Sequence, residues 1–142
     1  MSELTLAKAN TIIEIALAKA AEQKFKPLAV VVLDAGGHTI ALQRQDGAPF
    51  MRHEVAAGKA FGAIAMGSSS RALGQAAIER PHFFQGLAGV SGGRIIPVPG
   101  GVLIRDASGA AVGSVGISGD TSDNDEAAAV AGIEAAGFTA GV

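Results

Sequence analysis

In the first third of the chain, a segment whose apolar residues have helical spacing is followed by a segment with a strand-like pattern. Apolar side chains recur three or four residues apart between residues 5 and 24, which predicts a helix that Pro27 stops. The valine-rich run 28–33 predicts a buried strand. Glycines in the turn 34–38 adopt positive φ without steric cost, so the chain is expected to reverse there into a second strand, 38–45. This part predicts a helix followed by a β-hairpin.

Small residues dominate the middle of the chain. Residues 52–66 are mostly alanine and glycine with a few larger apolar side chains, and predict a second helix. Serines within 67–70 offer N-caps for a further helix over 71–80. Pro81 is tolerated at the first position of a helix, so a turn or short helix is expected to follow. The middle therefore predicts two or three consecutive helices.

The last part of the chain returns to a strand-like pattern. Three apolar runs, 94–98, 102–106 and 111–117, are separated by glycine-containing segments of hairpin length. An alanine-rich helix is then predicted over 123–136. Together the elements predict an α+β fold, in which a profilin-like or PAS-like, five-stranded, mostly antiparallel sheet is flanked by helices. The middle helices form an insertion between the two halves of the sheet and are expected to close over one of its faces.

Length and composition narrow the classes of protein. With 142 residues and no linker or internal repeat, residues 1–142 are expected to form one domain. The net charge of −2 gives no basis for binding nucleic acid or an anionic membrane. Because cysteine is absent, disulfides and thiolate chemistry are excluded. Neither a secretory signal nor a membrane span is predicted, so a cytoplasmic protein is expected. Its many small residues allow helices, strands and subunits to pack closely, and a homo-oligomer is expected.

Several separated motifs, in a fixed order, carry a resemblance to a known family. The chain resembles the GlcG/HbpS-like family and is similar to the C-terminal domain of PduO-type proteins. The resemblance covers about residues 4–138. The motifs are DAGGH at 34–38, ALQRQDGA at 41–48, GKA at 58–60, PGGV at 99–102 and VGISG at 115–119 followed by DNDEA at 123–127.

The resemblance implies a profilin-like domain that assembles into dimers or larger oligomers. It also makes haem the candidate cofactor, because some members of the family bind or degrade haem and some bind iron. The haem ligands of these relatives have no residue-by-residue match in this chain. The first predicted helix contains no histidine, so a ligand from that helix is not available.

Two histidines flank the predicted helical insertion and are candidate ligand-binding or catalytic residues. A neutral imidazole at His53 or His82 can coordinate haem iron or a metal, or act as a general base. Alternatively, each is a partly buried histidine satisfied by one hydrogen bond. His38 is expected to be an exposed residue of the hairpin turn.

Two cationic residues are further candidates for ligand binding. Arg44 can hold a carboxylate or a haem propionate through two parallel hydrogen bonds, or it can form an ion pair with Asp46. Lys59 stands in a helix of small residues, where it either extends to solvent, which we favour slightly, or contacts an anionic ligand.

An acidic cluster before the last helix has two interpretations. Asp120, Asp123 and Glu126 are candidate ligands of a divalent metal, although the spacing is not that of an EF-hand. The alternative is helix capping, because residues 122 and 125, and also 123 and 126, match a capping-box pattern. The glycines at 113, 116 and 119 do not form a dinucleotide fingerprint, and no nucleotide cofactor is expected.

Three functional hypotheses follow from these residues. The leading one is a cytoplasmic, oligomeric protein that binds haem or a similar planar or anionic small molecule between the sheet and the helical insertion, through Arg44, His53, Lys59 and His82. The second is a cofactor-independent enzyme of carboxylate or diol catabolism, with His53 or His82 as acid or base. The third is an accessory or assembly protein.

Overall fold

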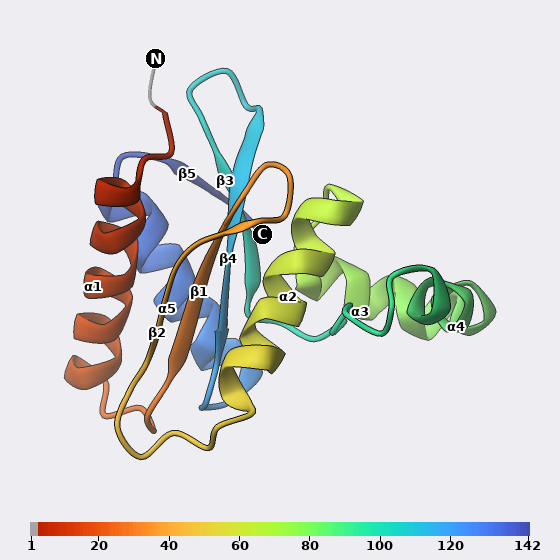
Figure 1. The fold of residues 1–142 in the computed structure, drawn as a ribbon, viewed down its shortest axis with the longest axis horizontal. Coiled ribbons are helices and arrows are strands. Elements are labelled where there is room, and N and C mark those ends of the chain that lie inside the picture. The colour runs from red at the N-terminus through yellow and green to blue at the C-terminus, as the bar shows by residue number, and fades with distance from the viewer. Residues whose placement is uncertain (1–2) are drawn as a thin grey trace.

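A computed structural model describes residues 3–142 as five helices around one five-stranded sheet (Figure 1). The prediction that no signal sequence is present concerns the N-terminus, whose first two residues lie outside this range. In chain order the elements are α1 (Leu6–Glu22), β1 (Ala29–Asp34), β2 (Thr39–Arg44), α2 (Arg52–Met66), α3 (Ser70–Glu79), α4 (Pro81–Val90), β3 (Gly101–Arg105), β4 (Ala111–Ser118), α5 (Ser122–Ala135) and β5 (Thr139–Gly141).

The sheet is open and antiparallel throughout. Its strand order is β2-β1-β4-β3-β5, and each neighbouring pair runs in opposite directions. Helices α1 and α5 pack against each other on one face, whereas α2 crosses the other face over β1, β4 and β3 (Figure 1). This arrangement confirms the predicted α+β fold, with one core on each side of the sheet.

Strand β1 is a continuous apolar run because helices cover both faces of the sheet there. Successive side chains of a strand point to opposite faces. Val30 and Val32 therefore join the core beneath α1 and α5, while Val31 and Leu33 join the core beneath α2. All of these side chains are buried, so polar residues have no place in the strand.

Glycines set the distance between the helices and the sheet. A Cβ added at Gly116 of β4 would collide with the backbone carbonyl of Ala56 in α2, and would lie 2.8 Å from the amide nitrogen of Ala60. On the other face, a Cβ at Gly132 of α5 would collide with the carbonyl oxygen of Ile12 in α1. The small residues noted in the sequence thus allow backbones to touch.

Two predicted elements differ from the structure. Residues 94–98 do not form a strand, and the fifth strand is instead the short β5, which pairs with the edge of β3. Segment 94–97 lies across glycines of α2 and α3 rather than beside the sheet: the amide of Ile96 donates to the carbonyl of Gly58, and Pro97 lacks the amide that a ladder needs. Pro81 begins a full helix of ten residues, α4.

The helical insertion does not close over the sheet as a whole. Only α2 covers it, whereas α3 and α4 extend away from the sheet and form an arm (Figure 1). The N-terminal half of α3 anchors this arm through the buried side chains of Ser70 and Leu73. None of the helices within residues 3–142 combines the length and the apolar character that crossing a membrane would require.

Candidate functional site

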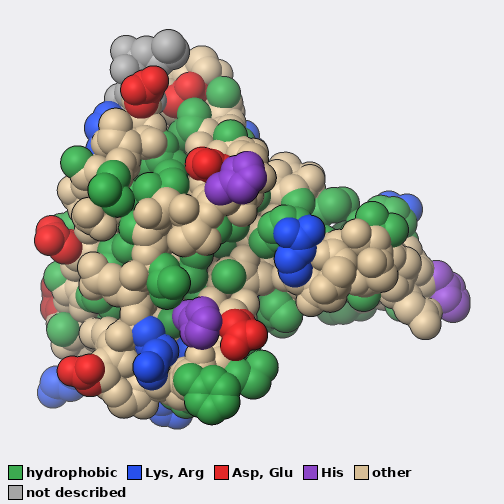
Figure 2. Space-filling model, viewed as in Figure 1, with side chains coloured by type: hydrophobic (Ala, Val, Ile, Leu, Met, Phe, Trp, Pro, Cys, Tyr) green, Lys and Arg blue, Asp and Glu red, His purple; other side chains and the backbone are tan. Residues whose placement is uncertain are grey.

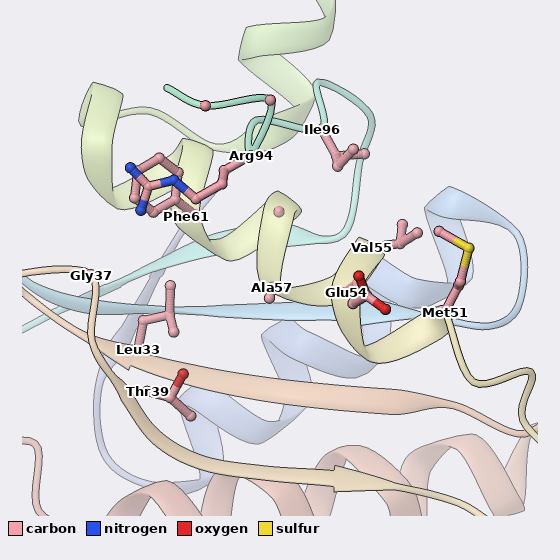
Figure 3. Close-up of a pocket in the computed structure, with 13 residues that line it drawn as sticks. Leu33, Gly37, Thr39, Met51, Glu54, Val55, Ala57, Phe61, Arg94 and Ile96 are labelled. Atoms are coloured by element: carbon pink, nitrogen blue, oxygen red, sulfur yellow. The ribbon is translucent and has the colours of Figure 1, made fainter. Parts of the chain in front are cut away.

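A pocket of about 510 Å³ opens where the β1–β2 turn, α2 and segment 92–96 meet (Figure 3). Most of its walls are apolar, with Leu33 at its floor and Val55, Phe61 and Ile96 on its sides. Pockets for small molecules commonly have volumes of roughly 300–1,000 Å³ and mostly apolar walls. We call this cavity the α2 pocket.

One end of the α2 pocket presents a planar cation. The guanidinium of Arg94 lies 3.9 Å above the ring of Phe61, and its Nε donates a 2.7 Å hydrogen bond to the carbonyl of Ser91. Within residues 3–142, no carboxylate forms an ion pair with Arg94. Stacking and one hydrogen bond therefore hold the guanidinium in place while its terminal nitrogens can meet an anionic ligand.

The other end of the pocket carries the opposite charge. Figure 3 shows Glu54 beside Met51 at the end away from Arg94. A ligand with an anionic group would therefore be oriented with that group toward Arg94. Sequence reasoning missed both charged residues. The available signals were an aromatic residue, Phe61, in a helix of small residues and an arginine directly after two glycines.

His53 lies next to the pocket but does not line it. Its Nδ1 is 2.7 Å from the carbonyl oxygen of Phe50. Because a carbonyl only accepts hydrogen bonds, Nδ1 must carry the proton, and in the neutral imidazole Nε2 then carries the lone pair. This is the tautomer that coordinates a metal through Nε2. The single hydrogen bond to Phe50 also agrees with the alternative prediction for His53, a histidine satisfied by one hydrogen bond.

The structure does not bring the predicted ligand-binding residues together. Arg44 is exposed at the end of β2, where its Nη1 donates a 2.8 Å hydrogen bond to the carbonyl of Ala48, and no ion pair with Asp46 forms. His82 is exposed on α4, in the arm. Neither residue lines the α2 pocket.

Lys59 does not extend to solvent, and that interpretation of the sequence is wrong. The residue is 2% exposed, and its Nζ lies 3.1 Å from Asp125 Oδ2 and 2.9 Å from the carbonyl oxygen of Ile117. Gly100, at φ +128°, leaves the room that this side chain fills, because a Cβ there would lie 2.8 Å from Nζ. Lys59 therefore links α2 to the start of α5 and to the backbone of β4 at Ile117.

The pKa values of this pair are set first by burial. Burial lowers the pKa of Lys59 and raises the pKa of Asp125, while the attraction between the two groups opposes both shifts. Asp125 Oδ1 also accepts a 2.9 Å hydrogen bond from the amide of Asp120. Asp125, which the sequence predicted to be part of a capping box, is therefore the buried partner of Lys59.

The predicted metal ligands are each engaged with other groups. Asp123 and Glu126 both pair with Arg71 of α3, and Asp120 accepts hydrogen bonds from the amides of Lys26 and Thr121. Within residues 3–142, no three acidic or histidine side chains gather in a way that could hold a metal ion. The helix cap also differs from the predicted capping box by one residue, because Thr121 is the N-cap.

Comparisons with known proteins agree with this architecture. The complex of PduOC with haem has a TM-score of 0.85 and 25% sequence identity, over 96% of this chain and 97% of that one. A double mutant of HbpS from Streptomyces reticuli gives 0.81 and 27%, over 94% and 87%. Protein ORFY from Klebsiella pneumoniae gives 0.84 and 26%, over 96% and 92%. No curated protein matches the sequence.

The fold and the pocket define a class of single-sheet α+β proteins with a pocket of small-molecule size beside a helix. A family model described as "Haem degrading protein HbpS-like" matches residues 4–134. The chain therefore belongs to the HbpS-like family, as its motifs predicted.

Proposed function

We propose that this chain is a single-domain, cytoplasmic, homo-oligomeric protein that binds haem, or a ligand of the same planar and anionic kind, in the α2 pocket. The observation that carries this proposal is the stacked pair of Arg94 and Phe61 at one end of a mostly apolar pocket. A haem-bound relative covering 96% of this chain supports the same ligand class.

The residues around the pocket fit the groups that haem presents. Leu33, Val55 and Ile96 offer apolar contact to a flat ring, and Arg94 offers a guanidinium to a propionate. His53 is outside the pocket lining but next in the chain to the lining residue Glu54, and it would supply the iron ligand by turning toward the pocket, because its hydrogen bond to Phe50 leaves Nε2 as the acceptor. Bound haem would supply an iron centre capable of redox chemistry.

A haemin titration followed by absorbance tests this proposal. We expect a saturable change of the Soret band at about one haem per chain. His53→Ala should shift the Soret maximum of the complex, and Arg94→Gln should weaken binding by about tenfold without that spectral shift, since 1.4 kcal/mol corresponds to a factor of ten. His38→Ala, on an exposed turn outside the pocket lining, is the matched control.

The remaining predicted residues enter the same experiment. Arg44→Ala, Lys59→Met and His82→Ala test whether residues that do not line the α2 pocket contribute to the ligand. If none of the variants changes a saturable signal, the ligand binds elsewhere. If the wild-type chain shows no Soret change at saturating haemin, haem binding is refuted for this protein.

The enzyme hypothesis receives no specific contact in its favour. Its two candidate acid–base residues, His53 and His82, belong to α2 and α4 and do not share the α2 pocket. The acids of its proposed metal site are held by Arg71 and by backbone amides. We therefore put forward ligand binding alone.

A further inference from the structure

A second pocket, of about 440 Å³, lies at the end of the molecule where α2 and α5 begin (Figure 1). Three separate parts of the chain supply its walls: residues 26–27 after α1, residues within 47–52 leading into α2, and residues 119–121 between β4 and α5. We call this cavity the junction pocket. It shares no lining residue with the α2 pocket, so it is a separate candidate site.

Two cationic residues line the junction pocket. Arg52, the first residue of α2, is half-buried, and its Nη1 donates a 3.2 Å hydrogen bond to the hydroxyl of Ser118. Lys26 is exposed to solvent. Within residues 3–142, neither cation forms an ion pair with a carboxylate. Figure 2 shows basic side chains at the lower end of the body, where α2 begins. The charge of Arg52 is therefore left for an anion to neutralise.

The surroundings of Arg52 add positive charge instead of compensating it. Burial is the main cause of the lowered pKa of Lys59, and repulsion from Arg52 lowers it further, which places the two cations close together. The buried carboxylate of Asp125 is already engaged, because its two oxygens accept from Lys59 Nζ and from the amide of Asp120. Two cations thus share the surroundings of one buried carboxylate.

Among the described residues, Asp120 is the one acid that lines the junction pocket, and its carboxylate holds the walls together. It accepts hydrogen bonds from the amide of Lys26 at 2.8 Å, from the amide of Thr121 at 2.8 Å and from a side-chain amide of α5 at 2.7 Å. Gly119, at φ +151°, lets these segments meet, because a Cβ there would collide with the carbonyl of Pro27. The walls are therefore formed before any ligand binds, and two cations against one carboxylate leave the lining positive.

We propose that the junction pocket binds the phosphate group of a phosphorylated small molecule. Arg52 offers a planar fork to two phosphate oxygens, and Lys26 offers a charged amine on a flexible stem. Thr121 Oγ1 accepts a hydrogen bond from the amide of Asn124, so its own hydrogen remains for a third phosphate oxygen.

Charge and volume favour this ligand over other anions. A phosphate monoester carries roughly −1.5 to −2 charges at pH 7, which matches the two cations, whereas a single carboxylate matches one. The volume of about 440 Å³ falls in the range of roughly 300–1,000 Å³ that is typical of pockets for organic molecules, so free phosphate would leave most of it empty. Pro27 and Pro49 give the organic part of the ligand apolar contacts.

Isothermal titration calorimetry of the complete chain tests the proposal, with phenyl phosphate as the probe in a phosphate-free buffer of constant ionic strength. We expect one saturable site per chain, with an affinity about tenfold higher than for inorganic phosphate or succinate. Arg52→Gln and Lys26→Met should each weaken binding by about tenfold. Lys24→Met removes the same charge from an exposed residue outside the lining and should bind as the wild type does.

Thermal unfolding separates binding from folding. Without an anion, Lys26→Met should unfold at the wild-type midpoint, but it should lose most of the increase in midpoint that phenyl phosphate gives the wild type. This variant is needed because Arg52→Gln also removes the hydrogen bond to Ser118. An absence of binding at about 10 mM phenyl phosphate overturns the proposal. Equal weakening by Lys24→Met also overturns it, because the attraction would then come from diffuse charge.

The comparison anions and haemin supply the remaining outcomes. Succinate bound as tightly as phenyl phosphate would indicate a dicarboxylate site, and equally tight inorganic phosphate would indicate a site for the free ion; either result overturns the proposal. Haemin should bind Lys26→Met as it binds the wild type, and phenyl phosphate should not displace it. Displacement would show that the junction pocket belongs to the haem site. A chain that binds phenyl phosphate but not haemin would support this site and refute only the proposed function.

Discussion

At the residue scale, the buried pair of Lys59 and Asp125 shows how one interaction joins distant parts of the chain. Removing one partner leaves the other buried without an opposite charge, which costs about 3–5 kcal/mol. Lys59→Met or Asp125→Leu should therefore lower the free energy of unfolding by that order. In urea denaturation, the exposed Lys26→Met is the control, expected within about 0.5 kcal/mol of the wild type.

Replacing both partners distinguishes pairing from packing. The double variant Lys59→Met, Asp125→Leu leaves no buried charge, so it should be less destabilised than the sum of the two single changes. The carbonyl of Ile117 and the amide of Asp120 would still lose their partners, which keeps some destabilisation. Single variants that unfold with the wild-type midpoint would show that the pair contributes little.

Asp120 gives the molecule a predictable response to acid. Hydrogen bonds from the amide of Lys26, the side chain of Asn124 and the amide of Thr121 hold the pKa of Asp120 below its usual 3.8. A carboxylate with a lowered pKa in the folded state stabilises the protein above the unfolded pKa, and this contribution is lost as the pH falls through the folded pKa. Asp120→Asn should thus lower the urea midpoint at pH 7, and by less at pH 2.

Comparing the two pH values tests that assignment directly. The difference in midpoint between wild type and Asp120→Asn should shrink steadily below about pH 3.8. Glu22→Gln, an exposed residue at the end of α1, serves as the control and should show little difference at either pH. A difference that stays constant down to pH 2 would mean that Asp120 acts through its shape rather than its charge.

The same residues show what the sequence could reveal of the site. His53 was identified because imidazole chemistry is visible in any sequence. Arg94 and Glu54 were not, because a pocket wall is assembled from α2 and a segment some 40 positions later in the chain. Lys59 was misjudged because its partner, Asp125, is 66 residues away. Tertiary neighbours of this kind leave no local pattern.

At the element scale, the close approach of α2 to β4 depends on Gly116. An alanine there would place its Cβ against the backbone of Ala56, where no side-chain movement can relieve the contact. Overpacking of this kind commonly costs 1–3 kcal/mol, and a rigid backbone neighbour places Gly116→Ala at about the upper end. Thermal unfolding should show a clear drop in midpoint.

A substitution at another position of β4 serves as the control for Gly116→Ala. Ala111→Val enlarges a half-buried residue at the first position of β4, and it should shift the midpoint far less. If Gly116→Ala unfolds like the wild type, α2 can move away from the sheet at low cost. In that case the α2 pocket, which α2 helps to form, should change shape in the variant and bind haemin differently.

The elements that the sequence predicted well are those with their own periodic pattern. The helix near residues 5–24, the first hairpin and strand 111–117 were all placed within a few residues. The predicted strand 94–98 was wrong because its apolar residues cover glycines of α2 and α3 instead of joining the sheet. Strand β5 has three residues and exists through pairing with the edge of β3, so it has no pattern of its own.

At the scale of the whole molecule, the sheet with α1, α2 and α5 forms a body, and the arm extends from it (Figure 1). Segment 91–96 returns from the arm to the body and supplies Arg94 to the α2 pocket. The arm and the pocket therefore share a connection, although they use different residues.

The few contacts of α4 predict that its amide hydrogens exchange quickly with solvent. Its amides have neighbours only in α3, so in a monomer they should exchange with deuterium through local opening, far faster than those of α2, which lies against the sheet. Hydrogen exchange measured on the complete chain should therefore be much faster in α4 than in α2. Exchange of α4 as slow as that of α2 would contradict a weakly held arm, because the contacts with α3 would then suffice to protect it.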